Sequence, residues 1–538
     1  MRPVAWVALL CAGLFASNVL AAPRGTLSAQ QKSRAAAPRK TPESPAPAQQ
    51  PSAPPSPAAA LTEQGSDLVQ KGDLDKAIAD FDKAIELDPQ YALAYTYRGY
   101  VYAMKGDLDR AFADYNKSIE IDPKLAAAYV FRGNAYRENG DLDRAFADYD
   151  KVIELDPKQA AAYTNRGYVY EKRGDLTNAF VDFDKAIQLD PKLAAPYVYR
   201  GYVYEKRGDV DRAIADFGKV IELDPKDTVT YIYRGYIYEK KGDLDRAIAD
   251  FDKAIELDPK DAAAYHDRGS AYQQTGDLDQ AIADYDKAIE LDPKDATAYN
   301  KRGSANQDKG EIDHAIADYD KAIELDPDDV AAYIDRGTAY QNKGDLDQAI
   351  ADFDKAIELD PKSARAYANR GSTHQDKGDL DRAIADYDQA IELDPKSARA
   401  YTDRGSASQD KGDLDRAIAD FDKATELDPK DAAAYRYRGY VYEKKGDLDH
   451  AIAEYDKAIE LNPNDAVSYS LRGNAYRNKG DIDHALADYD KAIELDPKYA
   501  AAYYNRGFAD VKKGWVVNAV TDFWQALSGR QNGKTGDF

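Results

Sequence analysis

Apolar and polar residues follow one another along most of the chain with the spacing of amphipathic helices. Within residues 126–159, Tyr129 and Tyr136 fall on one face of a predicted first helix, and Ala145 and Tyr149 fall on one face of a second. Two helices this short cannot bury their apolar faces alone, so neighbouring pairs must stack to complete a core.

The ends of these predicted helices recur at a fixed interval. Gly140 tolerates the left-handed conformation that ends a helix, Asp141 can cap the next helix, and Pro157 stops it. Prolines recur every 34 residues at 89, 123, 157, 191, 225, 259, 293, 327, 361, 395, 429, 463 and 497. A constant period of this size predicts an all-α solenoid of helix-turn-helix repeats, with fourteen repeats over residues 58–527.

The repeat resembles the tetratricopeptide repeat family. The family's framework offsets hold Tyr129, Gly133, Tyr136, Ala145, Tyr149 and Pro157. The resemblance covers residues 58 to about 527 and implies a right-handed superhelix whose first helices line a concave groove. It also implies a non-enzymatic scaffold that binds a protein or peptide partner in that groove. Together with the N-terminal segment, it indicates a secreted bacterial type.

Two departures from the family pattern bear on stability. Positions are counted from the first residue of each repeat, so that Ala126 is position 1 of repeat 3. From repeat 2 onward the leucine at position 7 is an arginine, as at Arg98, and we expect its guanidinium to pair with an acid of the second helix. A ladder of ligand-binding arginines is the alternative. Shorter polar residues replace the tyrosine at position 11 in repeats 8, 10, 11 and 14: Asn306, His374, Ser408 and Asp510. Because truncating a packed aromatic costs roughly 3–5 kcal/mol, we predict that repeats 8 to 11 open first.

The two ends of the chain differ from the repeats. Residues 1–21 carry one arginine, a short apolar run and small residues before Ala22, which predicts a signal peptide cut after Ala21. An uncleaved N-terminal anchor is the alternative. Residues 22–57 are rich in proline and alanine and predict a disordered linker, and residues 528–538 predict a polar tail. The expected location is the periplasm or the exterior of the cell.

Charge and composition exclude several functions. The formal net charge of -24 disfavours binding to nucleic acid, and no membrane insertion is expected after signal cleavage. The only cysteine, Cys11, lies in the predicted signal peptide. The five histidines have no metal-ligand spacing, and the repeated Gly-Asp-Leu-Asp lacks the ligand ladder of a calcium loop, although stacked aspartates could attract calcium weakly. We therefore expect no enzyme, no metal and no cofactor.

Residues that vary between repeats are the candidate contacts. Tyrosines in register on the first helices are Tyr97, Tyr100, Tyr168, Tyr199, Tyr202, Tyr233 and Tyr236, with Tyr437 and Tyr440 in repeat 12. Tyrosine gives a large contact area at low entropic cost, so these residues are predicted to grip a peptide. The alternative is that they pack between adjacent helices. Asn134 matches one offset of the family's clamp for chaperone C-terminal carboxylates, whose other residues are missing.

The last repeat is a second candidate surface. Trp515, Val516, Val517 and Trp524 fall in a terminal helix that no further repeat covers. Such an exposed apolar patch is typical of partner or self-association sites, unless the tail folds back over it. The alternative function is therefore a self-associating structural rod of the cell envelope.

Overall fold

The computed structural model describes residues 56–530. The predicted signal peptide (1–21), the predicted linker up to residue 55 and residues 531–538 of the predicted tail lie outside the described residues. The described chain divides into two compact units, with the boundary between Asp277 and Leu278.

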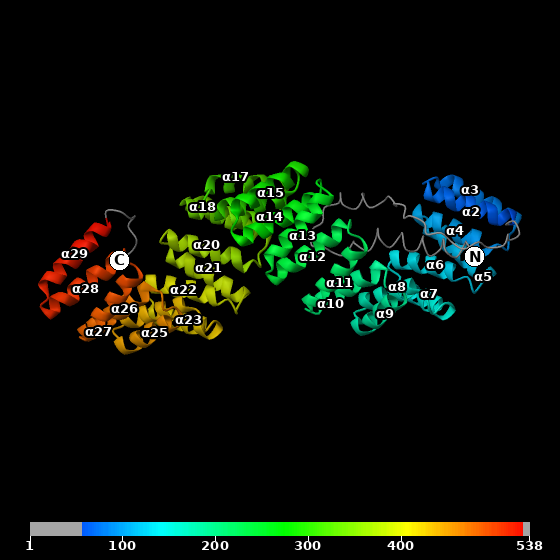
Figure 1. Ribbon diagram of the computed structural model, residues 1–538. Coiled ribbons are helices and arrows are strands. Elements are labelled where there is room, and N and C mark those ends of the chain that lie inside the picture. The colour runs from blue at the N-terminus through cyan, green and yellow to red at the C-terminus, as the bar shows by residue number, and fades with distance from the viewer. Residues whose placement is uncertain (1–55, 531–538) are drawn as a thin grey trace. The chain divides into compact units, whose positions relative to one another are not determined.

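The described residues form helices α2 to α29 (Figure 1). In the N-terminal unit these are α2 (Pro57–Gln70), α3 (Leu74–Leu87), α4 (Ala92–Met104), α5 (Leu108–Ile121), α6 (Ala126–Glu138), α7 (Leu142–Leu155), α8 (Ala160–Lys172), α9 (Leu176–Leu189), α10 (Ala194–Lys206), α11 (Val210–Leu223), α12 (Thr228–Lys241), α13 (Leu244–Leu257) and α14 (Ala262–Thr275).

The C-terminal unit continues the series with α15 (Leu278–Leu291), α16 (Ala296–Asp308), α17 (Ile312–Leu325), α18 (Val330–Lys343), α19 (Leu346–Leu359), α20 (Ala364–Asp376), α21 (Leu380–Leu393), α22 (Ala398–Lys411), α23 (Leu414–Leu427), α24 (Ala432–Lys444), α25 (Leu448–Leu461), α26 (Ala466–Lys479), α27 (Ile482–Leu495), α28 (Ala500–Lys513) and α29 (Val516–Arg530). Even-numbered helices up to α28 are the first helices of repeats 1 to 14, and odd-numbered helices are the second. The expected helix-turn-helix solenoid is confirmed.

Small residues set the distance between the two helices of a repeat. A Cβ atom on Gly133 would lie 2.9 Å from the ring of Tyr149, so only glycine lets the helices approach this closely. Ala145 and Tyr149 are completely buried beside it. Gly140 has φ 80° at the turn, and the Asp141 carboxylate accepts from the Arg144 amide to cap α7.

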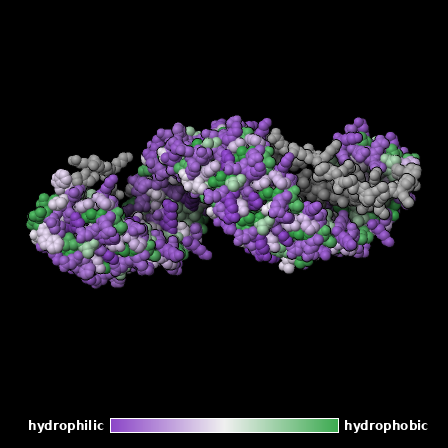
Figure 2. All heavy atoms as spheres, in the orientation of Figure 1, coloured by the Kyte–Doolittle hydropathy of each residue, from purple (hydrophilic) through white to green (hydrophobic). Residues whose placement is uncertain are grey.

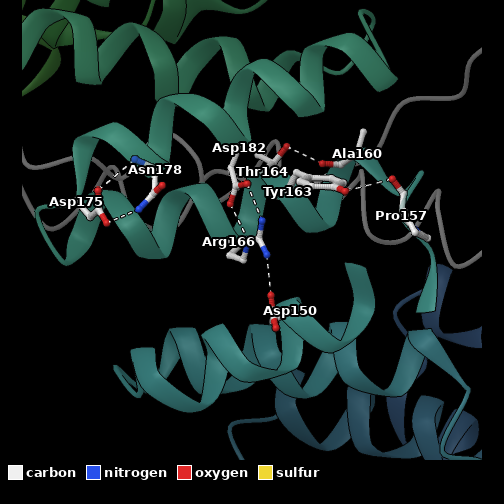
Figure 3. A network of polar contacts seen from close by, with 9 residues as sticks. All are labelled: Asp150, Pro157, Ala160, Tyr163, Thr164, Arg166, Asp175, Asn178 and Asp182. Carbon is white, nitrogen blue, oxygen red and sulfur yellow. Dashed lines mark hydrogen bonds and ion pairs between the residues drawn. The ribbon is translucent and has the colours of Figure 1, made fainter. Parts of the chain in front are cut away.

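In most repeats the arginine at position 7 also bonds to the repeat before it; for Arg234 the corresponding residue of the preceding repeat is Gly218, which has no side-chain acceptor. In repeat 4, the Arg166 guanidinium donates twice to Asp182 of its own second helix, at 2.8 Å each, and once to Asp150 of the preceding second helix, at 2.7 Å (Figure 3). The same two hydrogen bonds within the repeat join Arg98–Asp114, Arg132–Asp148, Arg200–Asp216, Arg234–Asp250, Arg302–Asp318, Arg336–Asp352, Arg370–Asp386, Arg404–Asp420, Arg472–Asp488 and Arg506–Asp522. This arginine fork confirms the predicted pairing with second-helix acids.

The polar residues at position 11 lie beside this fork. Asn306 donates to Asp318 at 3.0 Å, and His374 lies 3.8 Å from Asp386. Ser408 is completely buried and its hydroxyl has no hydrogen-bond partner. Burial, and secondarily the nearby Asp522 carboxylate, raise the pKa of Asp510. All four are buried where a tyrosine stands in other repeats, and early opening of repeats 8 to 11 stays a prediction.

Candidate protein-interaction surfaces

First helices of neighbouring repeats contact one another within each unit, as α4 does with α6 and α8 with α10. Position 9 of one repeat meets position 6 of the next: the rings of Tyr168 and Tyr199 lie 5.1 Å apart. In repeats 9 and 10 the same two positions are polar, and Asn369 donates to Thr338 at 3.3 Å. We call positions 6, 9, 12 and 13 of the first helices the first-helix face.

Three of the predicted contact tyrosines are buried in this arrangement. Tyr97 and Tyr100 are 5% and 7% exposed, because Phe131 of the next repeat lies 4.9 Å from the Tyr100 ring. Tyr199 is 8% exposed and stacks on Phe183 at 5.9 Å. These three residues pack between repeats, so the predicted contact set shrinks to the tyrosines that keep exposed surface.

Among the tyrosines at positions 6 and 9 of repeats 4 to 6, the exposed one lies on α12. Tyr202 and Tyr233, both partly buried, meet edge to face at 4.6 Å, and Tyr236 lies 6.2 Å from Tyr233. Tyr236 is 47% exposed. The reason lies one repeat further on, where position 6 is Asp267 rather than an aromatic residue. Tyr236 is therefore the aromatic residue that the first-helix face of this unit offers most openly.

The remaining predicted contact residues are Asn134, Tyr437 and Tyr440, and they differ in how far they pack within the structure. The side-chain oxygen of Asn134 accepts from the Tyr149 hydroxyl at 2.8 Å and from Asn165 at 3.3 Å, which gives it a packing role. In repeat 12, Tyr437 stacks on Phe421 at 5.8 Å, and the Lys444 ammonium lies 5.0 Å from the ring centre of Tyr440. Tyr437 and Tyr440 both keep part of their surface exposed.

A polar ladder on the first-helix face was not expected from the sequence. Position 12 of one repeat bonds to position 13 of the next, as in the ion pairs Glu171–Lys206 and Glu205–Lys240, the latter at 3.1 Å. The sequence does contain a sign of this ladder, because a glutamate directly precedes a lysine in each of repeats 4 to 6. The glutamate and lysine are adjacent in the sequence of one repeat, but each glutamate pairs with the lysine of the next repeat, 35 residues away.

In the C-terminal unit the ladder is built from amides and aspartates. Gln341 donates to Asp376 at 2.6 Å, and Gln375 donates to Asp410 at 2.8 Å. Each glutamine also reaches the serine at position 9 of the following repeat, Ser372 or Ser406, at 3.1 and 3.3 Å. A Glu–Lys step carries no net charge, whereas a Gln–Asp step adds one negative charge, so repeats 9 to 11 present a more acidic face.

Burial changes the ionisation of several groups on this face. It raises the pKa of the Tyr199 hydroxyl to about 12. It also raises the pKa of Glu239, although the Ser270 hydroxyl, which donates to it at 2.9 Å, opposes the shift. Burial raises the pKa of Asp403 too, against the opposing charge of Arg399. No group of His, Cys, Asp and Glu arranged to hold a metal ion occurs among residues 56–530.

The terminal helix α29 exposes its apolar side chains as expected. Trp515, just before the helix, is 51% exposed, and Val516, Val517 and Trp524 are 62%, 80% and 69% exposed. Figure 2 shows hydrophobic residues gathered at this C-terminal end, at the left of the view. Val520 and Leu527, which the sequence analysis did not single out, extend the exposed set. No helix in the described part of the chain is both long and apolar enough to cross a bilayer.

Comparison with solved structures finds other repeat proteins. A tetratricopeptide repeat protein from Parabacteroides merdae is 25% identical, with 46% of this chain and 98% of that chain covered and a TM-score of 0.40. YrrB, described as a TPR protein with an unusual peptide-binding site, is 27% identical over 34% of this chain and 95% of its own, with a TM-score of 0.30. Yeast Tom70 is 20% identical over 82% and 97%, with a TM-score of 0.38. No curated protein matches the sequence.

Family models give the assignment. Models described as "TPR repeat" or "Tetratricopeptide repeat" match residues 65–106, 92–125, 133–174, 160–193, 200–262, 235–302, 307–344, 334–398, 402–466, 454–487 and 473–514. Together they extend over nearly the whole of the helical array. Proteins built from these repeats are typically non-catalytic scaffolds for protein–protein interaction. The chain belongs to the tetratricopeptide repeat family.

Proposed function

We propose that the protein is a scaffold that holds a protein or peptide partner on the first-helix face of repeats 4 to 6. The observation that carries this proposal is the 47% exposure of Tyr236. Its ring lies beside the contacting pair Tyr202–Tyr233, and a second contacting pair, Tyr168–Tyr199, lies in the preceding repeats. A tyrosine side chain has only two side-chain torsions, so a partner can bury it at little entropic cost.

The surroundings of Tyr236 favour a peptide with apolar or aromatic side chains. Two nearby acids are paired with bases, Glu171 with Lys206 and Glu205 with Lys240, and the Glu239 carboxylate accepts from the neutral Ser270 and Gln274. A charged partner would have to compete with these ion pairs. An apolar side chain would instead cover the tyrosine rings, whose edges and faces it can contact without displacing an ion pair.

The proposal places the scaffold in the periplasm or outside the cell. The N-terminal 21 residues have the composition of a cleavable signal, and the protein would be of a secreted bacterial type. N-terminal sequencing of the protein recovered from an expressing bacterium tests this placement. We expect a mature chain that begins at Ala22, and an intact N-terminus at Met1 would contradict it.

Peptide display on the purified protein tests the contact surface. We expect selection of a peptide family whose Kd rises at least tenfold when Tyr168, Tyr202 and Tyr236 are all changed to serine, the residue found at position 9 of repeats 7, 8, 10 and 11. Circular dichroism would check that the variant keeps its helices.

The matched control changes the same position in the polar repeats. Thr338→Ala, Ser372→Ala and Ser406→Ala together should leave the Kd unchanged. If the serine variant binds the selected peptides as tightly as the parent, or if no peptide is selected, the aromatic first-helix face is not a binding surface.

A second candidate function, a self-associating rod of the cell envelope, is favoured by the exposed apolar side chains of α29. In a rod assembled end to end, α29 of one copy would be covered by α2 of the next. Sedimentation of the full chain over a range of concentrations tests it, because an open rod grows without a fixed size whereas a monomer does not grow at all.

A further inference from the structure

The apolar face of α29 occupies positions that a following repeat covers elsewhere. Leu486 on α27 is 9% exposed because α28 packs over it, and the residue at the same position of α29, Val520, is 63% exposed. Leu527 is 61% exposed on the same stripe. The terminal helix therefore presents an uncovered core surface.

This face also has no exposed charge. Between Val516 and Leu527 the one ionisable residue is Asp522, which is 3% exposed and held by Arg506 at 2.7 and 2.8 Å. The preceding second helix, α27, exposes Asp483 and Glu494. In a chain with a net charge of -24, an uncharged helix face is one that can meet an identical face without electrostatic repulsion.

The residue at the fork position of α29 offers no acceptor to the arginine of a following repeat of this type. On α27 that position is Asp490, which accepts from Arg506 of the next repeat at 2.5 Å. On α29 it is Trp524, which is 69% exposed and offers no acceptor for an arginine. A partner that covers Trp524 must bring an apolar surface to it.

The other end of the array does not supply that surface. Position 10 is Val101 in repeat 2, completely buried by the repeat before it, and the same position of α2 is the exposed Asp67. Glu63, Gln64 and Gln70 are exposed along the same face of α2. Contact between α29 and α2 would bury unpaired carboxylates against valine and tryptophan, which is costly. The ends therefore do not complement each other.

The exposed apolar set at α29 comprises two tryptophans, three valines and a leucine: Trp515, Val516, Val517, Val520, Trp524 and Leu527. The two tryptophans alone, given their exposed fractions of 51% and 69%, present on the order of 250 Å².

We infer that α29 pairs with α29 of a second copy, tail to tail about a two-fold axis. Such an interface uses the same patch on both chains and closes at two copies, so it forms a dimer and not a rod. The inference shares the exposed helix with the rod hypothesis but is independent of peptide binding on the first-helix face. Its consequence is that one assembly presents two copies of the aromatic surface.

A single-cysteine variant tests the pairing. In the full chain, Cys11→Ser removes the only cysteine, and Val520→Cys then places one thiol on the exposed face of α29. Sedimentation should give a dimer at micromolar concentration, and a short bismaleimide should link the two copies into a covalent dimer and nothing larger. The control, Cys11→Ser with Ala60→Cys on the exposed face of α2, should give no covalent dimer.

Two further variants separate the interface from the fold. Trp524→Asp and Val517→Asp lie at side chains 69% and 80% exposed, so each should leave the helical circular dichroism unchanged and convert the dimer to a monomer. A monomeric parent would overturn the pairing. A dimer that the thiol at position 520 does not link would also overturn it, and so would a ladder of products from the chain carrying both Ala60→Cys and Val520→Cys, which would favour the rod.

Discussion

The first helices of repeats 4 to 6 and of repeats 9 to 11 place different chemistry on one framework. Gly167 and Gly371 both abut a second-helix ring, and Arg166 and Arg370 make the same fork. Position 9 holds tyrosine in repeats 4 to 6, but threonine or serine in repeats 9 to 11. Packing therefore fixes the framework residues, while the side chains of the first-helix face differ between repeats.

The largest expected difference concerns position 6. Tyr199→Ala removes a ring that is 8% exposed and contacts Phe183 and Tyr168, so it should cost about 3–5 kcal/mol. Asn369→Ala at the same position of repeat 10 loses one hydrogen bond to Thr338 and should cost about 1 kcal/mol. Hydrogen exchange of α10 and α20 measures both losses. Equal losses in the two helices would contradict the different roles of position 6 in repeats 5 and 10.

The arginine fork should behave alike in the two regions. Arg166→Leu and Arg370→Leu each strand a buried aspartate, Asp182 or Asp386, and should each cost about 3 kcal/mol. Urea unfolding of the two variants gives the measurement. A loss confined to one region would mean that the fork is not a shared element of the framework.

Restoring an aromatic residue at position 11 should stabilise the first helix of repeat 11 against local opening. Ser408→Tyr replaces an unpartnered buried hydroxyl with a ring that can stack on Arg416, as Tyr204 does on Arg212 at 4.7 Å. We expect a gain of about 1 kcal/mol in the opening free energy of α22. Tyr204→Ser should lower the opening free energy of α10. No change in either helix would contradict the prediction that repeats 8 to 11 open first.

The smallest expected effect depends on pH. Burial lowers the pKa of His374 below its usual 6.5, an effect that the nearby Asp386 opposes and Arg370 reinforces. A lowered histidine pKa means that the unfolded state binds the proton more readily, so stability is lost as pH falls below 6.5. The charges of two further residues act on the pKa of His374: Asp379 raises it and Arg382 lowers it.

Hydrogen exchange of α20 at pH 7.5 and pH 5.5 checks this sign, after correction for intrinsic rates. His374→Asn should remove the part of the pH dependence that comes from this histidine. His484→Asn, at an exposed histidine on α27, serves as the control. Identical pH dependence in the parent and the His374→Asn variant would contradict the account.

Much of the fold could be predicted because it repeats. The 34-residue period, the glycine at each turn and the arginine at position 7 determine the helix pairs and their ion pairs, and the structure has both. Burial on the first-helix face could not be predicted from single repeats. Tyr100 and Tyr236 hold the same position, yet one faces Phe131 and the other precedes a repeat with Asp267, so exposure depends on the next repeat.

The most direct test of the central claim is hydrogen exchange of the full chain with and without a peptide selected by display. The account predicts slower exchange in α8, α10 and α12 and no change in α18, α20 and α22. Protection confined to α18, α20 and α22, or no protection in any first helix, would contradict the assignment of binding to the aromatic repeats.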